Sequence, residues 1–445
     1  MYSIDVIAAF DFLEKEETIG MLNYERKRGK PSYTFTYNNT FLAKHPRLVL
    51  SQDLGFFSGE QAMTDNLFRF LSDALPDRWG RALIDKREKI EARNANRIPR
   101  EFDDFGYLIR IDDTTRMGAL RFKYKGAYLG TDNGNMEIPP ITTLNTFIDE
   151  THKIEEAERK RQPIEDKWIY NVWKQGSSLG GARPKMSIID EDGNLNIAKI
   201  PSTKDTYDVE FWEHFASLLA RQAGINAAKT RILRIGPTPY HTLLSQRFDR
   251  DGKKRIHFAS SLTIAGLKDG DGAGNGKGYI DIVDAIVSCC GTSSTDENTH
   301  ELFRRVAFNI LIGNYDDHFR NHGFLLNEKG WSLSPAYDIN PTNQTIQSLN
   351  ITPYDNKSSI KNLLKNCEYY LISQNDAIEI LKQTTLAVEK WRYIANNLLI
   401  PLSEQKRFEA RFTWSLQEAR QLFPKNKSIT VPAQPNRKKK KGISF

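Results

Sequence analysis

Residues 306–338 hold the feature that most limits how this chain can fold, an apolar run that ends in a dense polar cluster. The run "VAFNILI" has the composition of a buried helix, and "GNYDDHFRN", residues 313–321, follows it closely. Two strand-like pieces, "GFLLN" and "WSLSP", then flank a polar "EKG" turn and lead to Asp338. A hairpin at this place would return Asp338 to the loop that contains Asn321. The pattern therefore predicts polar groups gathered at the end of a buried helix.

Asp316, Asn321 and Asp338 have the residue types and the order of a phosphoryl-transfer site. In protein kinases, the Asp of an Asp-x-x-x-x-Asn loop accepts a proton, while the Asn and a later Asp bind the metal ion. Carboxylate and amide oxygens suit Mg²⁺, which is a hard cation. Taken alone, the cluster fits a polar helix-to-strand turn equally well.

A Gly-rich turn precedes this region in the order that kinases use. "SSLGGARPK" leads into "MSIID" and "NIAKI", and an "EDGN" turn between these two pieces predicts a hairpin. Adjacent glycines let backbone N–H groups approach phosphates closely, and a lysine one strand later, Lys199, is placed to reach them. The helix predicted from "YDVEFWEHFASLLARQAGI" offers Glu213 as a partner for Lys199. Because Glu213 points away from the apolar face of that helix, it faces either the cleft or water.

The order of predicted elements indicates an α+β fold with two lobes. In residues 1–130 we predict a helix in "DNLFRFLSDALP" and strands in "SYTFTYN", "FGYLIRI" and "GALRFKY". The other expected units are a charged linker or helix (131–175), a small lobe with the Gly-rich turn (176–265), a helical lobe (266–428) and a basic, disordered tail (429–445).

Composition narrows the class of protein. The 445 residues carry a net charge of +7, of which "NRKKKK" in the tail supplies much, so the tail is either solvated or an arm for nucleic acid. Three cysteines form no pattern of a zinc site or a disulfide framework. The start of the chain lacks the features of a signal peptide, and no apolar stretch approaches the roughly 20 residues of a membrane helix. We therefore expect a cytoplasmic protein that does not enter a membrane.

Several ordered motifs resemble the HipA-type serine/threonine kinases, which are toxins of bacterial type II toxin–antitoxin modules. "LFRFLSDALPDRWGR" and "MGALRF" are similar to the N-terminal subdomain of that family. "SSLGGARPK", "IAKIP", "RFDR", "IGNYDDHFRNHGFLL" and "LSPAYDI" are similar to its kinase core. The resemblance implies a two-lobe, protein-kinase-like fold of the HipA type, with an N-terminal α/β subdomain and a helical C-terminal lobe.

The resemblance also implies a role for individual residues. Asp316 would be the catalytic base, and Asn321 and Asp338 would bind Mg²⁺. Autophosphorylation of Ser178 would eject the Gly-rich loop and switch the kinase off. The implied contacts of ATP are the phosphate-binding residues Gly180, Gly181, Ala182, Arg183, Pro184, Lys185 and Lys199, the adenine hinge Gln246, Arg247 and Phe248, and the lining residues His318 and Tyr337.

Asp317 departs from the family pattern, because a small residue usually follows the catalytic Asp, and it adds a negative charge near the expected metal site.

The family further implies a dimeric, DNA-binding antitoxin of the HipB type as partner, contact with DNA through that antitoxin, and a protein substrate that is sometimes an aminoacyl-tRNA synthetase. Two other functions stay open on the sequence. They are a kinase-fold transcriptional corepressor that acts through the antitoxin, and a small-molecule or lipid kinase.

Overall fold

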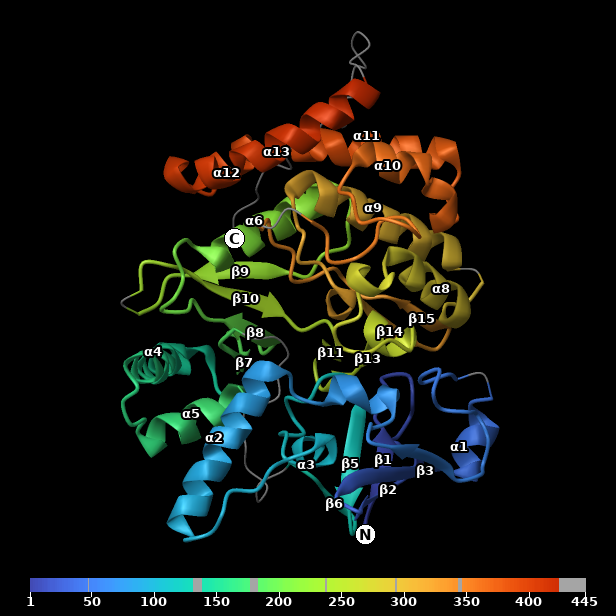
Figure 1. Cartoon of the computed structure of the whole chain (residues 1–445), viewed down its shortest axis with the longest axis vertical. Helices are drawn as coiled ribbons and strands as arrows, with labels where there is room; N and C mark the ends of the chain where they lie inside the picture. The colour runs from blue at the N-terminus through green and yellow to red at the C-terminus, as the bar shows by residue number, and fades with distance from the viewer. Residues whose placement is uncertain are drawn as a thin grey trace, which may run out of the picture.

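The structure is a computed structural model that describes residues 1–46, 48–130, 138–176, 183–236, 238–292, 294–342 and 346–423. Within these ranges, an N-terminal sheet lies at one end of the long axis and the C-terminal helices lie at the other (Figure 1). The mixture of helices and strands confirms the predicted α+β class. The basic tail, together with Ser178, Gly180, Gly181 and Ala182 of the Gly-rich turn, lies outside the described residues.

Antiparallel strands form the N-terminal sheet in the order β4-β3-β2-β1-β5-β6. Its strands are β1 Tyr2–Ala8, β2 Glu17–Lys27, β3 Lys30–Tyr37, β4 Gln61–Thr64, β5 Leu120–Tyr124 and β6 Ala127–Tyr128. Strand β3 confirms the prediction from "SYTFTYN", because the alternating residues Tyr33, Phe35 and Tyr37 are the buried ones. Strand β5 confirms the prediction from "GALRFKY". The sheet is flanked by α1 Asn39–Lys44, η1 Arg69–Ala74 and α3 Asp104–Leu108.

Two predictions in this part differ from the structure. The segment "FGYLIRI", predicted as a strand, begins in helix α3, because the Asp103 side chain caps that helix by accepting from the Gly106 N–H at 3.0 Å. The segment "DNLFRFLSDALP", predicted as an α-helix, contains only the short 3₁₀ helix η1. Pro76 explains its early end, because the residue before a proline avoids the helical region, and Leu75 is extended.

A second hydrophobic core joins the N-terminal part of the chain to the small lobe. The small-lobe sheet has the order β7-β8-β10-β9, with β7 Lys185–Ile189, β8 Leu195–Lys199, β9 Thr230–Leu233 and β10 Thr242–Gln246. Helices α2 Arg78–Asn94, α4 Leu144–Lys160 and α5 Asp166–Gly176 lie against it, after the 3₁₀ turn η2 Ile141–Thr143 (Figure 1). This core contains Leu83, Phe147, Val172, Ile188 and Leu244, so it crosses three of the units expected from the sequence.

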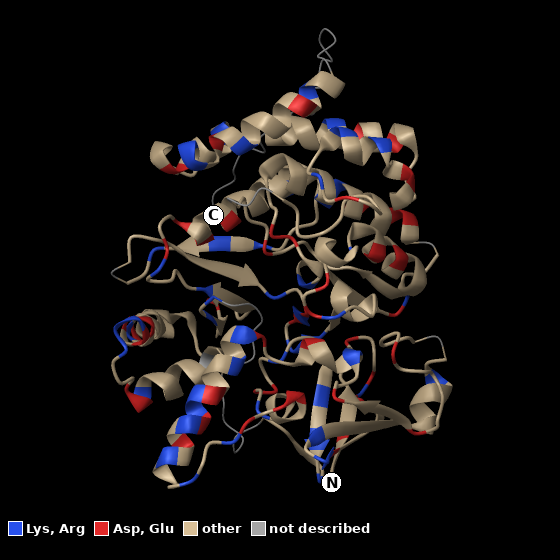
Figure 2. Ribbon diagram, in the orientation of Figure 1, with Lys and Arg blue, Asp and Glu red and all other residues tan. Residues whose placement is uncertain are grey.

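The charged segment that was predicted as a linker or helix thus forms two packed helices. Helix α4 buries Phe147, Ile148 and Ile154 on one face, together with the polar residues Thr151 and Glu155. Charged residues of α2 also face these helices. Lys86 pairs with Glu158 of α4 at 2.7 Å, and the acidic and basic side chains of α2 are interspersed along its length (Figure 2).

Helix α6 Val209–Gln222 lies between β8 and β9 in the chain, and the larger lobe, which follows β10, is mostly helical. Its sheet has the order β13-β14-β15, in which the predicted hairpin of "GFLLN" and "WSLSP" is confirmed by pairs from Phe324 with Leu333 to Asn327 with Gly330. Its elements are β11 Arg250–Asp251, β12 Lys254–Arg255, β13 His257–Ser260, α7 Ser261–Ile264, η3 Ala273–Asn275, α8 Tyr279–Cys289, α9 Thr295–Ile312, η4 Phe319–Asn321, β14 Gly323–Asn327, β15 Gly330–Leu333, α10 Ile360–Lys365, η5 Cys367–Tyr370, α11 Gln374–Val388, α12 Trp391–Asn397 and α13 Leu402–Leu422.

The main hydrophobic core is continuous from the N-terminal sheet to the C-terminal helices. It includes Phe35 of β3, Phe215 of α6, Phe308 of α9 and Phe412 of α13, all of them fully buried. Over the ranges that the structure describes, no helix combines the length and the apolar character needed to cross a membrane.

Candidate active site

The polar cluster that the sequence singled out forms a loop at the end of helix α9. The helix stops at Gly313, whose φ of 73° is in the left-handed region that glycine adopts easily. The loop then runs to η4, where the Asn321 side chain donates to the Asp316 carbonyl at 3.4 Å. Asp316 is exposed and Asn321 is buried. The loop therefore presents an exposed carboxylate close to a buried amide.

Asp317 points into the protein, away from solvent. Its Oδ2 accepts from the Tyr279 hydroxyl at 2.7 Å and the Asn309 amide at 2.8 Å, and it contacts His322 Nε2 at 2.7 Å. Burial alone would raise the pKa of this carboxyl, but His322 and the other partners hold it below its usual range. The charge that departs from the family pattern therefore anchors the loop internally.

Lys199 joins the two lobes at the centre of the site. Its Nζ lies 2.7 Å from both oxygens of Glu213 and 2.7 Å from Oδ1 of Asp338. The Lys199–Glu213 pair that the sequence left open is therefore formed in the structure. Burial alone would lower the pKa of Lys199, but the two carboxylates outweigh it and raise that pKa above its usual range. In turn, Lys199 holds the pKa of Asp338 well below its usual range.

The segment that carries Asp338 is held from both sides. The Ala228 N–H donates to the Ala336 carbonyl at 2.9 Å, and the Tyr337 hydroxyl donates to the Arg320 carbonyl of the loop at 2.6 Å. Asp338 itself has a φ of 57°, a left-handed conformation that Asp adopts more readily than most residues. These bonds bring Asp338 back toward the Asn321 loop, as the predicted hairpin requires.

The strand after the Gly-rich turn places a second lysine beside Lys199. Lys185 of β7 pairs directly with Lys199 of β8 in the sheet, and it is buried. Burial, aided by the neighbouring Lys199 charge, lowers the pKa of Lys185 to about 8. Arg183 instead forms a bidentate pair with Asp205, at 2.8 and 2.6 Å, and contacts Glu210. Arg183 thus fixes the base of the turn, next to Pro184.

The predicted hinge is tied into the sheet. The N–H groups of Gln246 and Arg247 donate to the carbonyls of Lys229 and Leu195, each at 2.9 Å, so neither is available to adenine in this conformation. The Phe248 ring lies 5.5 Å from the Tyr337 ring, which connects the hinge to the Asp338 segment. His318, in the loop, is half-buried.

Helix α6 carries Glu213 and is held by helix α13. The Trp212 indole donates to Glu404 at 2.9 Å, and the Asp208 N–H donates to the same carboxylate at 3.3 Å. The Trp212 and Phe408 rings are 4.6 Å apart. We refer to Trp212, Glu404 and Phe408 as the α6–α13 brace.

Sequence reasoning missed the brace and the internal partners of Asp317. One signal was present for the latter, because Asn309 interrupts the apolar run "VAFNILI" and a buried polar side chain needs a partner. Nothing local marks Tyr279 or Glu404, because each meets the site only through the tertiary fold.

The residues present fit Mg²⁺ and a nucleotide. Mg²⁺ usually binds one or two carboxylates and keeps other positions for water and phosphate oxygens. Asp338 is an ionised carboxylate and Asn321 offers an amide oxygen, while Lys185 and Lys199 supply positive charge close to Asp338. The described residues contain no cluster of three or more His, Cys, Asp or Glu side chains that would indicate a different kind of metal centre.

Two domains of a known protein family together match most of the chain. The HipA N-terminal domain matches residues 11–123, and the HipA-like C-terminal domain matches residues 177–391. A serine/threonine-protein kinase toxin HipA from Shewanella oneidensis is 26% identical over 262 residues, which are 52% of this chain and 55% of that protein. A putative kinase from Haemophilus influenzae is 25% identical over 183 residues, which are 37% of this chain and 53% of that protein. The aligned stretches thus span about half the length of these relatives.

A solved complex of HipA, HipB and operator DNA from Shewanella oneidensis contains a chain with a similar fold. The TM-score is 0.62 at 18% sequence identity, and the match covers 91% of this chain and 95% of the other. The similarity confirms the predicted two-lobe fold of the HipA type.

Proposed function

Because the chain belongs to the HipA-type family, we propose that it is an ATP-dependent protein serine/threonine kinase and the toxin of a toxin–antitoxin module. The observation that carries the proposal is the contact of Lys199 with both Glu213 and Asp338 at 2.7 Å. These residues come from a strand, a helix and the segment after a hairpin. Phosphoryl transfer in kinases depends on a Lys–Glu pair and a metal-binding Asp placed together in this way.

Each residue at this junction has a role in the proposed reaction. ATP with Mg²⁺ would supply the phosphoryl group and neutralise the charge that develops during transfer. Asn321 and Asp338 would hold the metal ion, and Lys185 and Lys199 would bind the phosphates. Asp316, exposed on the loop, would accept the proton of a serine or threonine hydroxyl. The internal bonds of Asp317 keep that loop in one position.

The nucleotide-binding groups outside this junction are proposed from the family resemblance. Phe248 and Tyr337 pack together at the hinge, where adenine would lie, and His318, half-buried on the loop, would line the site. Gln246 and Arg247 would form the hinge together with Phe248. Gly180, Gly181 and Ala182, with Arg183 and Pro184 at the base of the turn, would enclose the phosphates.

The catalytic assignment is tested with Asp316→Gln. Wild type and variant are incubated with Mg-ATP, and phosphate incorporation and nucleotide affinity are measured separately. Loss of a general base typically lowers the rate about 10²–10⁴-fold, so transfer should fall by at least that factor while ATP affinity stays near wild type. Normal phosphate incorporation by the variant would contradict the role of Asp316.

We also propose that Ser178 is a regulatory phosphosite. A phosphate there would add about −1.5 to −2 charge near neutral pH and compete with ATP for Lys199 and the turn. Ser178→Ala should stay unphosphorylated at this turn after incubation with Mg-ATP and keep its ATP affinity, whereas wild type should lose affinity. Phosphorylation at other sites with unchanged affinity would refute the switch and leave the kinase proposal standing.

A DNA-binding antitoxin is the proposed partner, because the similar solved chain lies in a complex with HipB and operator DNA. That complex also supports the second candidate function, a corepressor that acts through the antitoxin. The two functions separate in one experiment, in which Asp316→Gln is tested for repression and for growth inhibition. If the protein is a toxin kinase, growth inhibition should be lost in the variant and repression should stay.

The protein substrate is identified by comparing phosphoproteomes of cells that express wild type or Asp316→Gln. The family resemblance suggests that the substrate is an aminoacyl-tRNA synthetase in some members.

A further inference from the structure

The N-terminal subdomain meets the hinge region through side-chain contacts to which the proposed chemistry gives no role. The segment 112–118 of the N-terminal subdomain contacts the segment 247–255, which begins within the hinge. Asp249 accepts from the Gly118 N–H at 2.7 Å and from Arg247 Nη2 at 2.6 Å. Arg247 also donates to the carbonyls of Thr115 and Arg116, at 2.9 and 3.2 Å. We call this set of contacts the hinge joint.

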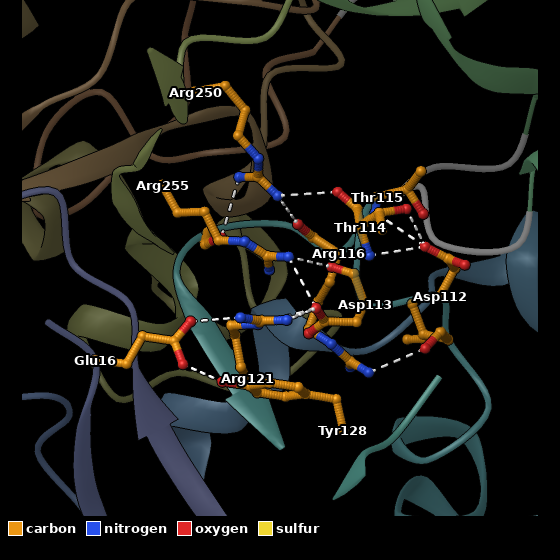
Figure 3. A network of polar contacts seen from close by, with 12 residues as sticks. Glu16, Asp112, Asp113, Thr114, Thr115, Arg116, Arg121, Tyr128, Arg250 and Arg255 are labelled. Atoms are coloured by element: carbon orange, nitrogen blue, oxygen red, sulfur yellow. Dashed lines mark hydrogen bonds and ion pairs between the residues drawn. The ribbon is translucent and has the colours of Figure 1, made fainter. Parts of the chain in front are cut away.

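The hinge joint continues outward as a network of alternating charges (Figure 3). Arg250 donates to the Arg116 carbonyl at 2.6 Å, and Arg255 donates to the Asp113 carbonyl at 2.8 Å. Asp113 then pairs with Arg121 at 2.6 Å, and Arg121 pairs in turn with Glu16 at the outer end. The inner contacts cross from the N-terminal subdomain to the hinge, whereas the outer ones stay within the subdomain.

Burial gives the inner contacts a fixed geometry. Asp249 is 0% exposed and Arg247 is 3% exposed. Buried ions are costly unless every charge has its partners, so a displaced hinge would leave a guanidinium or a carboxylate unpaired. Although burial by itself would raise it, the pKa of Asp249 is held well below its usual range by Arg247 and Arg250. The planar fork of Arg247 binds a carboxylate and two carbonyls at once, which a flexible side chain cannot do.

Arg247 transmits this geometry to the nucleotide site. Its own N–H donates to the Leu195 carbonyl of β8, and it lies between Gln246 and Phe248. Phe248 contacts Tyr337, the neighbour of Asp338. We propose that Arg247 and Asp249 are positioning residues through which the N-terminal subdomain sets the hinge for adenine, so that this subdomain determines nucleotide affinity and selectivity. The inference rests on the proposed kinase function.

Arg247→Lys tests the positioning role at moderate risk to folding, because it keeps the positive charge beside Asp249 and removes the fork. The dissociation constants of a non-hydrolysable ATP analogue and of the matching GTP analogue are measured on the full chain. We expect affinity for the ATP analogue to fall about 3- to 10-fold, the equivalent of roughly one hydrogen bond. Affinity for the GTP analogue should change less, so the ratio of the two affinities, which measures the preference for adenine, should decrease.

Arg121→Lys is the matched control. Arg121 is also paired with a buried aspartate of the same network, but its side-chain partners Asp113 and Glu16 belong to the N-terminal subdomain. This variant should lose stability without a change in adenine preference. Equal losses of affinity in both variants, or wild-type binding by Arg247→Lys, would overturn the inference.

A second measurement covers the case in which Arg247→Lys fails to fold. Coupling between two sites is reciprocal, so the ATP analogue should slow amide hydrogen exchange at residues 115–118 of wild type. Binding of the analogue without added protection there would also overturn the inference. If wild type binds no nucleotide, the proposed kinase function fails first, which separates that failure from a failure of the hinge joint.

Discussion

At the scale of single residues, the geometry of the candidate site depends on buried groups behind it, such as the partners of Asp317. The sequence predicted Asp316, Asn321, Asp338 and Lys199 from residue type and order, and the structure brings Lys199, Glu213 and Asp338 together. The sequence could not show where Asp317 points, because the direction of a side chain in a loop depends on partners far away in the chain. Whether the predicted residues perform their roles stays a prediction.

Asp317→Asn should destabilise the protein and slow phosphate transfer with little effect on nucleotide affinity. Three groups share one oxygen of this buried carboxylate, and leaving them poorly paired costs about 1–3 kcal/mol. Because the folded-state pKa of Asp317 is lowered, its stabilising effect is present above the unfolded pKa of about 4 and is lost as pH falls through the folded value. Denaturant unfolding of both proteins should therefore show a difference in stability that shrinks below pH about 4.

From the lowered pKa of Lys185, we predict that the protein takes up a proton when nucleotide binds. With a pKa of about 8, this lysine is half neutral at that pH, and nearby phosphates would favour its charged form. Calorimetric titration at pH about 8, in buffers of different ionisation enthalpy, should reveal uptake of about half a proton per nucleotide. The uptake should fade toward pH about 6, where the lysine is already charged. Lys185→Met is the control, and uptake that persists in it would assign the proton to another group.

At the scale of elements, periodicity predicted most helices and strands but not what each polar face meets. The wheel of helix α6 correctly put Phe211 and Phe215 on the packed face, and it left Glu213 facing either the cleft or water. The prediction of a strand in "FGYLIRI" was wrong, because a short apolar run fits either a strand or a helix. The Asp103 cap stabilises the helix there. A local pattern of residues could not predict which contacts hold these elements in the tertiary fold.

Glu404→Ala should weaken the α6–α13 brace and lower kinase activity from a distance. It leaves the buried Trp212 indole without its acceptor, a loss of about 1–3 kcal/mol, and loosens the helix that holds Glu213. Hydrogen exchange across residues 209–216 should quicken and the KM for ATP should rise. Glu409→Ala is the control, because Glu409 pairs with Arg392 of α12 near the surface, and its effect should stay within about 0.5 kcal/mol. Equal behaviour of the two variants would reject the brace.

At the scale of the whole molecule, two cores tie together the units that the sequence separated. The order of motifs was enough to predict the two-lobe fold, because each motif corresponds to a particular position in the kinase fold. It could not reveal that α2 of the N-terminal part covers the small-lobe sheet, since amphipathic patterns show that a face is buried but not against which partner.

The shared cores predict that the chain unfolds as one unit. Leu83 of α2 and Leu244 of β10 belong to one core, while Phe35 and Phe412 belong to the other, so neither end can open without exposing apolar surface of the rest. Calorimetry should give one transition whose calorimetric and van't Hoff enthalpies agree. An early separate transition of the N-terminal sheet would contradict this expectation.

The α6–α13 brace joins residues that are made far apart in time. Glu213 leaves the ribosome long before Glu404, since roughly 190 residues separate them. At about 5–20 residues per second, that distance corresponds to about 10–40 s of translation. During this interval Trp212 has neither Glu404 nor Phe408 beside it, so helix α6 lacks the support of the brace. The order of elements along the chain thus delays completion of the brace until helix α13 has been made.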